Sequence, residues 1–286
     1  MKKTFIIMIC SVLLLCAVPA IAEQNQAIDL IIFAGQSNMA GRGVTSEQWP
    51  EEAPKVAEGA GWEFRAVSDP TKLYPIEEPF GLNENKRAGI NDAWGPVLSK
   101  SGSMVSAFVN AYYAECGVPV IAVSASKGGS GISEWVPGSN YLTDCLGRLA
   151  DAKNWLETNG YQIRHIFCAW CQGETDGDNG TPAEEYTAYF HKILDEMTAS
   201  GVEKMFMIRI GQCNAPDGEG RYQPMIELQD KIAASDDRVI MVSELLAGMR
   251  ERGLMKDDFH YFQQGYNEVG TDAGKNAALF VKELDN

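Results

Sequence analysis

The sequence predicts an α/β protein, a three-layer α/β/α sandwich with a mainly parallel sheet of about five strands. Two observations support this fold class. Short apolar, β-branched runs recur along the chain, each too short and too continuous for an amphipathic helix. They cover Asp29 to Ala34, Pro119 to Ser124, His165 to Trp170, Lys204 to Ile210 and Arg238 to Val242. Segments with apolar residues at helical spacing separate several of them, and such alternation favours a parallel sheet.

The beginning of the chain is typical of an export signal. Two lysines precede an apolar stretch from Phe5 to Val18, and the small-residue pattern of Ala20 to Ala22 follows. The apolar stretch is shorter than the ~20 residues that a membrane-spanning helix needs. We therefore expect a cleaved signal peptide over residues 1–22 rather than a membrane anchor, a periplasmic or secreted protein, and a single domain over residues 23–286.

The charge of the chain excludes some partners. The formal net charge is −15, and loss of the two signal-peptide lysines would make it −17. An acidic surface of this kind repels nucleic acid and anionic membranes. It is compatible with a neutral substrate such as an acylated sugar, although charge alone selects no substrate.

Helical periodicity is clearest in three places after the first strand. Apolar residues share one face in two of them, at Val105, Phe108, Val109 and Tyr112, and at Tyr186, Phe190, Ile193 and Met197. A third pattern runs from Tyr266 to Leu284 and closes the chain.

The segment from about residue 44 to 96 shows no sustained period, and we expect a long surface excursion there. Its Trp49, Trp62 and Trp94 either contact a substrate or form small satellite cores.

Five of the seven cysteines follow the predicted signal peptide, and an odd number cannot pair completely within one molecule. Cys168 and Cys171 form a C-x-x-C pattern that would suit a redox or metal site. However, they lie in a predicted strand, where residues three apart are separated by about 10 Å, too far for a disulfide. We therefore expect these two cysteines to pack in the core, and we expect no metal site.

A candidate nucleophile follows the first strand. The run Gly35 to Gly43 places Ser37 just past the carboxyl end of that strand, where open α/β sheets hold their ligands. A serine beside glycine is also common in an ordinary turn or as a helix cap. The glycine spacing fits neither phosphate-binding pattern, G-x-G-x-x-G or G-x-x-x-x-G-K-[ST].

A serine nucleophile needs a base, usually a histidine that a carboxylate orients. Of the three histidines, His165 begins a predicted strand and His191 lies within a predicted helix, so both are expected to be structural. His260 follows Asp257 by three residues in a loop between the last strand and the last helix, and residues three apart can face each other in a tight turn. Asp257 is therefore the expected orienting residue, although a cluster of aspartates at a helix start is an alternative explanation.

Four motifs occur in order along the chain and together resemble a known family. They are Gly35-Gln-Ser-Asn-Met, Lys127-Gly-Gly-Ser-Gly-Ile-Ser-Glu-Trp135, Gln172-Gly-Glu-Thr-Asp and Asp257-x-x-His260. They resemble the signature blocks of SGNH hydrolases, in the carbohydrate-esterase branch that includes acetyl xylan esterases and sialate O-acetylesterases. The resemblance implies a flavodoxin-like fold and a serine esterase that removes acetyl groups from a carbohydrate without metal or organic cofactor.

The resemblance also implies roles for particular residues. Ser37 would attack the ester carbonyl, His260 would carry the proton, and Asp257 would hold the imidazole. The oxyanion donors would be the backbone N–H of Ser37, the backbone N–H of Gly129 or its neighbour Gly128, and the side-chain amide of Gln172.

Some alternatives remain open at this point. Many relatives have histidine at the position of Cys171, and Glu174 is an alternative triad acid or a substrate contact. No residue separates xylan-type from sialate-type activity. Two other functions are compatible with the fold: a non-catalytic carbohydrate-binding protein and a flavin or redox protein. The presence of Ser37, Gln172 and His260 together favours the esterase.

Overall fold

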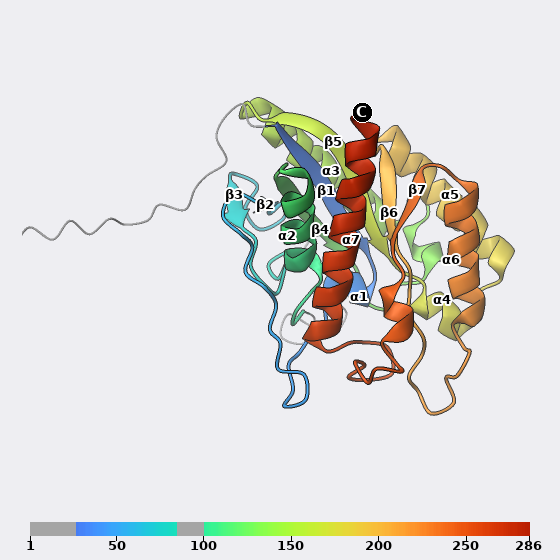
Figure 1. Ribbon diagram of the computed structural model, residues 1–286. Helices are drawn as coiled ribbons and strands as arrows, with labels where there is room; N and C mark the ends of the chain where they lie inside the picture. Colours follow the sequence, from blue (N-terminus) through green and yellow to red (C-terminus); the bar gives the residue numbers. More distant parts are fainter. Residues whose placement is uncertain (1–26, 85–99) are drawn as a thin grey trace, which may run out of the picture.

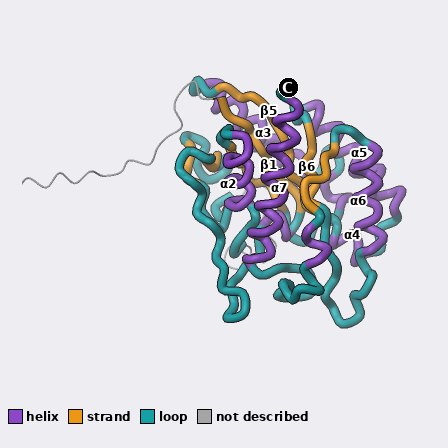
Figure 2. The backbone as a smooth tube through the Cα atoms, viewed as in Figure 1, coloured by secondary structure: helices purple, strands orange, loops and turns teal. Residues whose placement is uncertain are grey.

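The computed structural model describes residues 27–84 and 100–286 (Figure 1). In these residues one sheet lies between two layers of helices, so the predicted α/β/α fold class is confirmed (Figures 1 and 2). The sheet order is β3-β2-β4-β1-β5-β6-β7, and its pairs are parallel except β2 with β3. The strands are β1 (Ala27–Gly35), β2 (Gly61–Phe64), β3 (Leu73–Pro75), β4 (Val120–Ser126), β5 (Gln162–Cys171), β6 (Lys204–Ile208) and β7 (Val239–Ser243).

All five predicted strands are present, as β1, β4, β5, β6 and β7. The sheet has seven described strands rather than about five, because β2 and β3 extend one edge from within the segment expected to be a loop excursion. These strands have only four and three residues, too few to show a period in the sequence.

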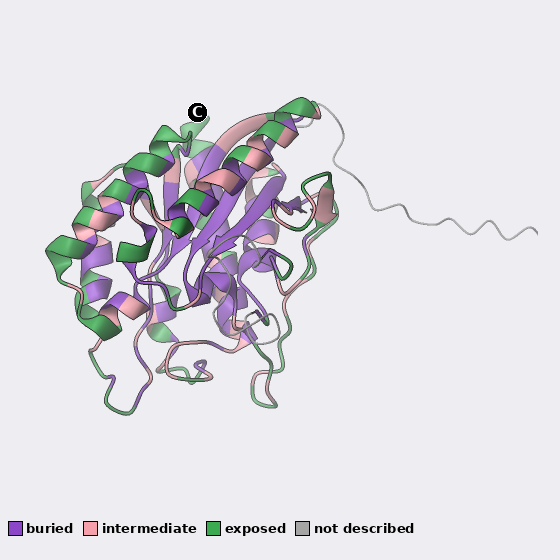
Figure 3. Ribbon diagram, turned by 180° about the vertical axis from the view of Figure 1, so that it is seen from behind, coloured by how far each residue is buried: buried purple, intermediate pink, exposed green. Residues whose placement is uncertain are grey.

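The helices cover both faces of the sheet. On one face, α2 (Val105–Cys116) packs against α7 (Gln263–Leu284), as Figure 1 shows in front of the strands. The other face is covered by α3 (Asn140–Thr158), α5 (Ala183–Ala199) and α6 (Gln223–Ser235), seen in Figure 3. The short elements are α1 (Ser37–Ala40), α4 (Glu174–Asn179) and two 3₁₀ helices, Ile132–Trp135 and Leu245–Gly248.

Burial of both sheet faces explains the continuous apolar runs in the sequence. Along β1, Leu30 and Ile32 enter the core beneath α3, α5 and α6, whereas Ile31 and Phe33 enter the core beneath α2 and α7. Successive side chains of a strand point to opposite faces, so a strand covered on both sides is apolar at most of its positions.

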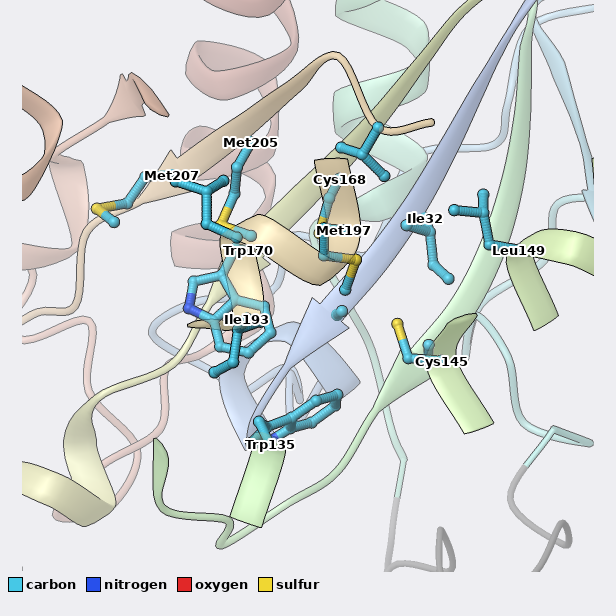
Figure 4. Packing of buried hydrophobic residues seen from close by; sticks show 14 of the residues in the cluster. Ile32, Trp135, Cys145, Leu149, Cys168, Trp170, Ile193, Met197, Met205 and Met207 are labelled. Carbon is cyan, nitrogen blue, oxygen red and sulfur yellow. The ribbon is translucent and has the colours of Figure 1, made fainter. Parts of the chain in front are cut away.

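The five described cysteines are free, and the predicted core packing of the C-x-x-C pair is confirmed. Cys168 lies in the core near Trp170 and Cys145 (Figure 4), and Cys171 lies in the core on the opposite face of the sheet.

The tryptophans of the 44–96 segment divide between the core and its edge. Trp62 is buried on β2, and Trp49 packs against the core and donates its indole N–H to the backbone oxygen of Gly253 at 3.0 Å. Trp94 lies outside the described residues.

The predicted signal peptide, residues 1–22, also lies outside the described residues, so export and signal cleavage stay predictions. Of the helices that the structure describes, none has the length and apolar character to cross a bilayer.

Candidate active site

The predicted nucleophile sits on a tight turn after β1. Gly35 ends the strand with φ of 127°, and a Cβ atom there would lie 2.1 Å from the backbone oxygen of Cys171 on β5. Only glycine fits such a position without displacing the neighbouring strand. The turn delivers Ser37 to the carboxyl edge of the sheet, where its side chain is largely buried at the start of α1.

The structure brings Ser37, His260 and Asp257 together. The Nε2 atom of His260 lies 3.0 Å from Oγ of Ser37. Its Nδ1 atom lies 3.0 Å from each carboxylate oxygen of Asp257. The imidazole therefore bridges hydroxyl and carboxylate, the geometry in which a histidine can accept a serine proton.

Local hydrogen bonds hold the Asp257 carboxylate in place. Its Oδ1 atom accepts the backbone N–H of Phe259 at 2.9 Å and that of His260 at 2.7 Å. The loop is also tied to a neighbouring segment, because the backbone N–H of Asn214 donates to the backbone oxygen of Asp258 at 3.0 Å. Asp257 and His260 thus form a compact turn whose shape follows from their three-residue spacing.

These interactions also set the charge state of Asp257. Partial burial acts to raise the pKa of its carboxyl group, but hydrogen bonds from the His260 ring and from two backbone N–H groups outweigh burial. The pKa of Asp257 therefore lies below its ordinary value, and the side chain is a carboxylate at neutral pH.

The side chain of Gln36 joins the nucleophile turn to the loop after β5. Its Oε1 atom accepts the backbone N–H of Gly173 at 3.0 Å and that of Thr175 at 3.4 Å. This contact aligns the start of α4 with Ser37. Gln36 was not among the predicted site residues, although its position directly before Ser37 in the first motif could have identified it.

Gln172 requires a correction. Its side chain is fully buried, and its amide nitrogen lies 2.5 Å from Oδ2 of Asp176, 3.1 Å from the backbone oxygen of Ser130 and 3.3 Å from Oε1 of Gln36. Tyr186 donates its hydroxyl to the amide oxygen. The amide is directed into the protein rather than to the surface beside Ser37, because buried acceptors from three segments surround it. We therefore do not assign it to an oxyanion hole.

Asn38 is a second residue that the sequence reasoning missed. Its amide donates to Oε1 of Glu174 at 2.5 Å and to the backbone oxygen of Phe259 at 3.1 Å, and its own oxygen accepts the hydroxyl of Tyr266 at 2.6 Å. It thereby connects α1, α4, α7 and the loop that carries His260. Glu174 is bonded to Asn38, whereas Nδ1 of His260 faces Asp257, so the geometry favours Asp257 over Glu174 as the residue that orients the imidazole.

A pocket of about 340 Å³ opens above these residues. It is lined by Gln36, Ser37, Arg42, Gly128, Gly129, Glu174, Thr175, Asp178, Phe259 and His260. Within the described part of the chain, the backbone N–H groups of Ser37 and Gly129 donate to no protein acceptor. Acyl transfer requires a nucleophile, a base and hydrogen-bond donors for the oxyanion, and the Ser37 hydroxyl, the His260 imidazole and these two N–H groups can supply them.

The other two histidines lie outside this pocket. His165 is held between Glu203 and Asp285 at 2.8 and 2.9 Å, and His191 lies 3.6 Å from Asp236. Trp49 and Trp62 do not line the pocket either, which agrees with a packing role.

Comparison with known proteins places the chain among carbohydrate esterases. Residues 27–278 match the family described as SASA, carbohydrate esterase, sialic acid-specific acetylesterase. A protein of known structure from Arabidopsis thaliana is similar, with TM-score 0.65 and 20% identity over 90% of this chain and 99% of that one. A carbohydrate acetylesterase from Xanthomonas citri has TM-score 0.54 and 17% identity over 88% of this chain and 56% of that longer one. No curated protein matches the sequence.

Proposed function

The chain belongs to the family of carbohydrate esterases described as sialic acid-specific acetylesterases, and from this premise we propose that it removes O-acetyl groups from a carbohydrate through an acyl-enzyme on Ser37. The observation that carries the proposal is the continuous contact from the Ser37 hydroxyl through His260 to Asp257. A carbohydrate-binding protein without catalytic activity has no need of such a contact. The fold alone does not decide the activity, because many functions share it.

The reaction follows from the positions of these groups. Oγ of Ser37 attacks the acetyl carbonyl while Nε2 of His260 takes its proton, and His260 then delivers that proton to the leaving sugar hydroxyl. Water hydrolyses the resulting acetyl-serine with the same histidine as base. Asp257 stabilises the imidazolium during both steps, and it is already ionised because its pKa is low.

The negative charge on the acetyl oxygen needs hydrogen-bond donors in the pocket. Ser37 and Gly129 line that pocket, and their backbone N–H groups have no acceptor among the described residues, so we assign them this role. Each donor of this kind commonly lowers the barrier by about 3 kcal/mol.

The sugar itself is a separate question. The family description names sialic acid, and the related protein from Xanthomonas citri is described as a carbohydrate acetylesterase. We therefore propose an O-acetylated sugar as the substrate class, with O-acetylated sialic acid and acetylated xylan as the two candidates. The predicted export would place the enzyme where it meets such material.

The test is acetate release by the purified protein from 4-nitrophenyl acetate, acetylated xylan and O-acetylated sialic acid. We expect hydrolysis of at least one ester, and loss of nearly all of it in Ser37→Ala. A Ser200→Ala variant, which changes an exposed serine at the end of α5, serves as the matched control. Reaction with a fluorophosphonate should add mass to the peptide that contains Ser37. Equal activity of Ser37→Ala and wild type, or no activity on any ester, would refute the proposal.

A further inference from the structure

One carboxyl oxygen of Glu174 is buried and has no hydrogen-bond partner among the residues that the structure describes. The residue is 2% exposed, and its Oε2 atom accepts or donates no hydrogen bond within the described residues. The other oxygen, Oε1, accepts the amide of Asn38. A buried polar atom without a partner is costly, and such atoms commonly mark a place where a ligand or reacting group completes the site.

The position of Glu174 relates this atom to the reaction. Glu174 lines the same pocket as Ser37, Gly129 and His260. Asn38 fixes one carboxyl oxygen, and Asn38 is itself held by Tyr266 and the backbone of Phe259. The carboxyl group is therefore held in one orientation before substrate binds, as an effective transition-state contact requires.

The surroundings of Glu174 favour its neutral form. Burial raises the pKa of its carboxyl group; the hydrogen bond from Asn38 and the charge of His260 act in the opposite direction, and Asp178 adds to the rise. Burial also raises the pKa of four groups that interact with Glu174, so they carry no charge at physiological pH: Cys171, Tyr186, Tyr222 and Tyr261.

A neutral carboxyl group with Oε1 occupied offers one hydrogen-bond donor, the hydroxyl of Oε2. The acceptor that forms in this pocket during acyl transfer is the oxygen of the tetrahedral intermediate. Gln172, the side chain expected to meet that oxygen, is directed into the protein instead.

We propose that Glu174 acts as a neutral carboxylic acid whose Oε2–H donates a hydrogen bond to the developing oxyanion, as the third donor beside the N–H groups of Ser37 and Gly129. The inference rests on the proposed esterase function. The proton stays on Glu174 throughout, so the residue supplies a hydrogen bond and takes no part in the proton transfers of His260. A carboxylic acid kept neutral by an apolar site serves as such a donor in other enzymes.

Two substitutions separate this role from its alternatives. Glu174→Gln keeps an oxygen for Asn38 and places an N–H donor where Oε2–H lies. Glu174→Met fills a similar volume without any donor. Glu185→Gln makes the same chemical change as the first variant on an exposed residue of α5 and serves as the control.

We expect Glu174→Met to lower kcat by about 10²- to 10³-fold, the usual effect of losing one oxyanion donor, and Glu174→Gln to retain most of the activity. The loss should be equal for 4-nitrophenyl acetate, which carries no sugar hydroxyl, and for the acetylated sugar. Wild-type kcat should also fall as pH rises and Glu174 loses its proton, whereas Glu174→Gln should lack this fall. Circular dichroism would show whether Glu174→Met folds. If it does not, the pH profiles of wild type and Glu174→Gln still test whether Glu174 acts as a protonated donor.

Three results would overturn the inference. Loss of activity in Glu174→Gln as severe as in Glu174→Met would mean that the ionised carboxylate is required. A loss confined to the sugar ester would mean that Glu174 binds a sugar hydroxyl. Wild-type activity in both variants would mean that it has no role in the reaction. These results differ from a failure of the esterase proposal itself, which an inactive wild type or an active Ser37→Ala variant would show.

Discussion

At the scale of single residues, the site depends on how each side chain's charge state is set. Asp257 and Glu174 are both carboxylic acids near His260, but their surroundings push their pKa values in opposite directions. Asp257 accepts hydrogen bonds from several N–H groups and stays ionised. Glu174 is buried, and among the described side chains it accepts a hydrogen bond from Asn38. In the proposed mechanism the two like groups have different functions, Asp257 as an anion and Glu174 as an acid.

Loss of the Asp257 charge should slow the reaction strongly. We expect Asp257→Asn to lower kcat by about two to four orders of magnitude, because an amide cannot hold the required imidazole tautomer or stabilise its positive charge. Steady-state hydrolysis of 4-nitrophenyl acetate measures the effect. Asp258→Asn, which removes the neighbouring carboxylate, should stay close to wild type, and an equal loss in both variants would contradict a specific role for Asp257.

The same carboxylate should make stability depend on pH in the acid range. The folded-state pKa of Asp257 is lowered, so its contribution is complete above the unfolded pKa of about 3.9 and is lost as pH falls through the folded value. Thermal unfolding between about pH 2 and 6 should show a smaller acid-induced decrease for Asp257→Asn than for wild type. Parallel curves for the two proteins would contradict this expectation.

At the scale of elements, the carboxyl edge of the sheet determines which segments can meet. Ser37 follows β1, Gly129 follows β4 and Glu174 follows β5, and these three strands are neighbours in the sheet. His260 arrives on the loop between β7 and α7. The turn at Gly35 sets how closely β1 and β5 approach at this edge, and therefore where the nucleophile points.

We expect Gly35→Ala to destabilise the protein by more than a backbone penalty alone. A positive φ costs a non-glycine residue roughly 1–3 kcal/mol, and here the new Cβ would also meet the backbone of β5. Gly160→Ala is the matched control, because Gly160 has φ of 81° but nothing within 4 Å of its Cβ position. Urea unfolding of both variants gives the comparison; equal losses would mean that the contact with β5 is unimportant.

At the scale of the whole molecule, a buried arginine connects distant parts of the chain. Arg148 on α3 is 1% exposed and bonds to Asp144 at 2.6 Å, to the backbone oxygen of Ser124 on β4 at 2.7 Å and to that of Glu84 at 2.8 Å. These contacts join a helix, a central strand and the segment that carries β2 and β3. Arg148 thus adds a polar connection to the strand pairing of β2 with β4 that already holds this edge of the sheet.

Removing that side chain should cost about 3–5 kcal/mol of unfolding free energy, because Arg148→Met removes a buried ion pair with Asp144 and the donor of two buried backbone oxygens. Urea unfolding provides the measurement. The double variant with Asp144→Asn should recover part of the loss, since it removes the buried negative charge that Arg148 balances in the wild type. A single variant as stable as wild type would show that solvent replaces the lost donor.

Several features of this protein could be predicted from its sequence because they depend on local patterns. The strands β1, β4, β5, β6 and β7 are buried on both faces and appear as continuous apolar runs. Ser37 follows such a run directly, and Asp257 and His260 are three residues apart within one turn. The proximity of Asp257 to His260 could therefore be predicted without knowledge of distant contacts.

The tertiary structure decided the features that depend on partners far away in the chain. Glu174 meets Asn38 across 136 residues, and Gln172 lies within the same network of buried side chains. Motif order indicated that both residues lie near the nucleophile, but not which of them faces the pocket. The direction of a buried polar side chain is set by the donors and acceptors that the whole fold brings around it, and these are absent from any local stretch of sequence.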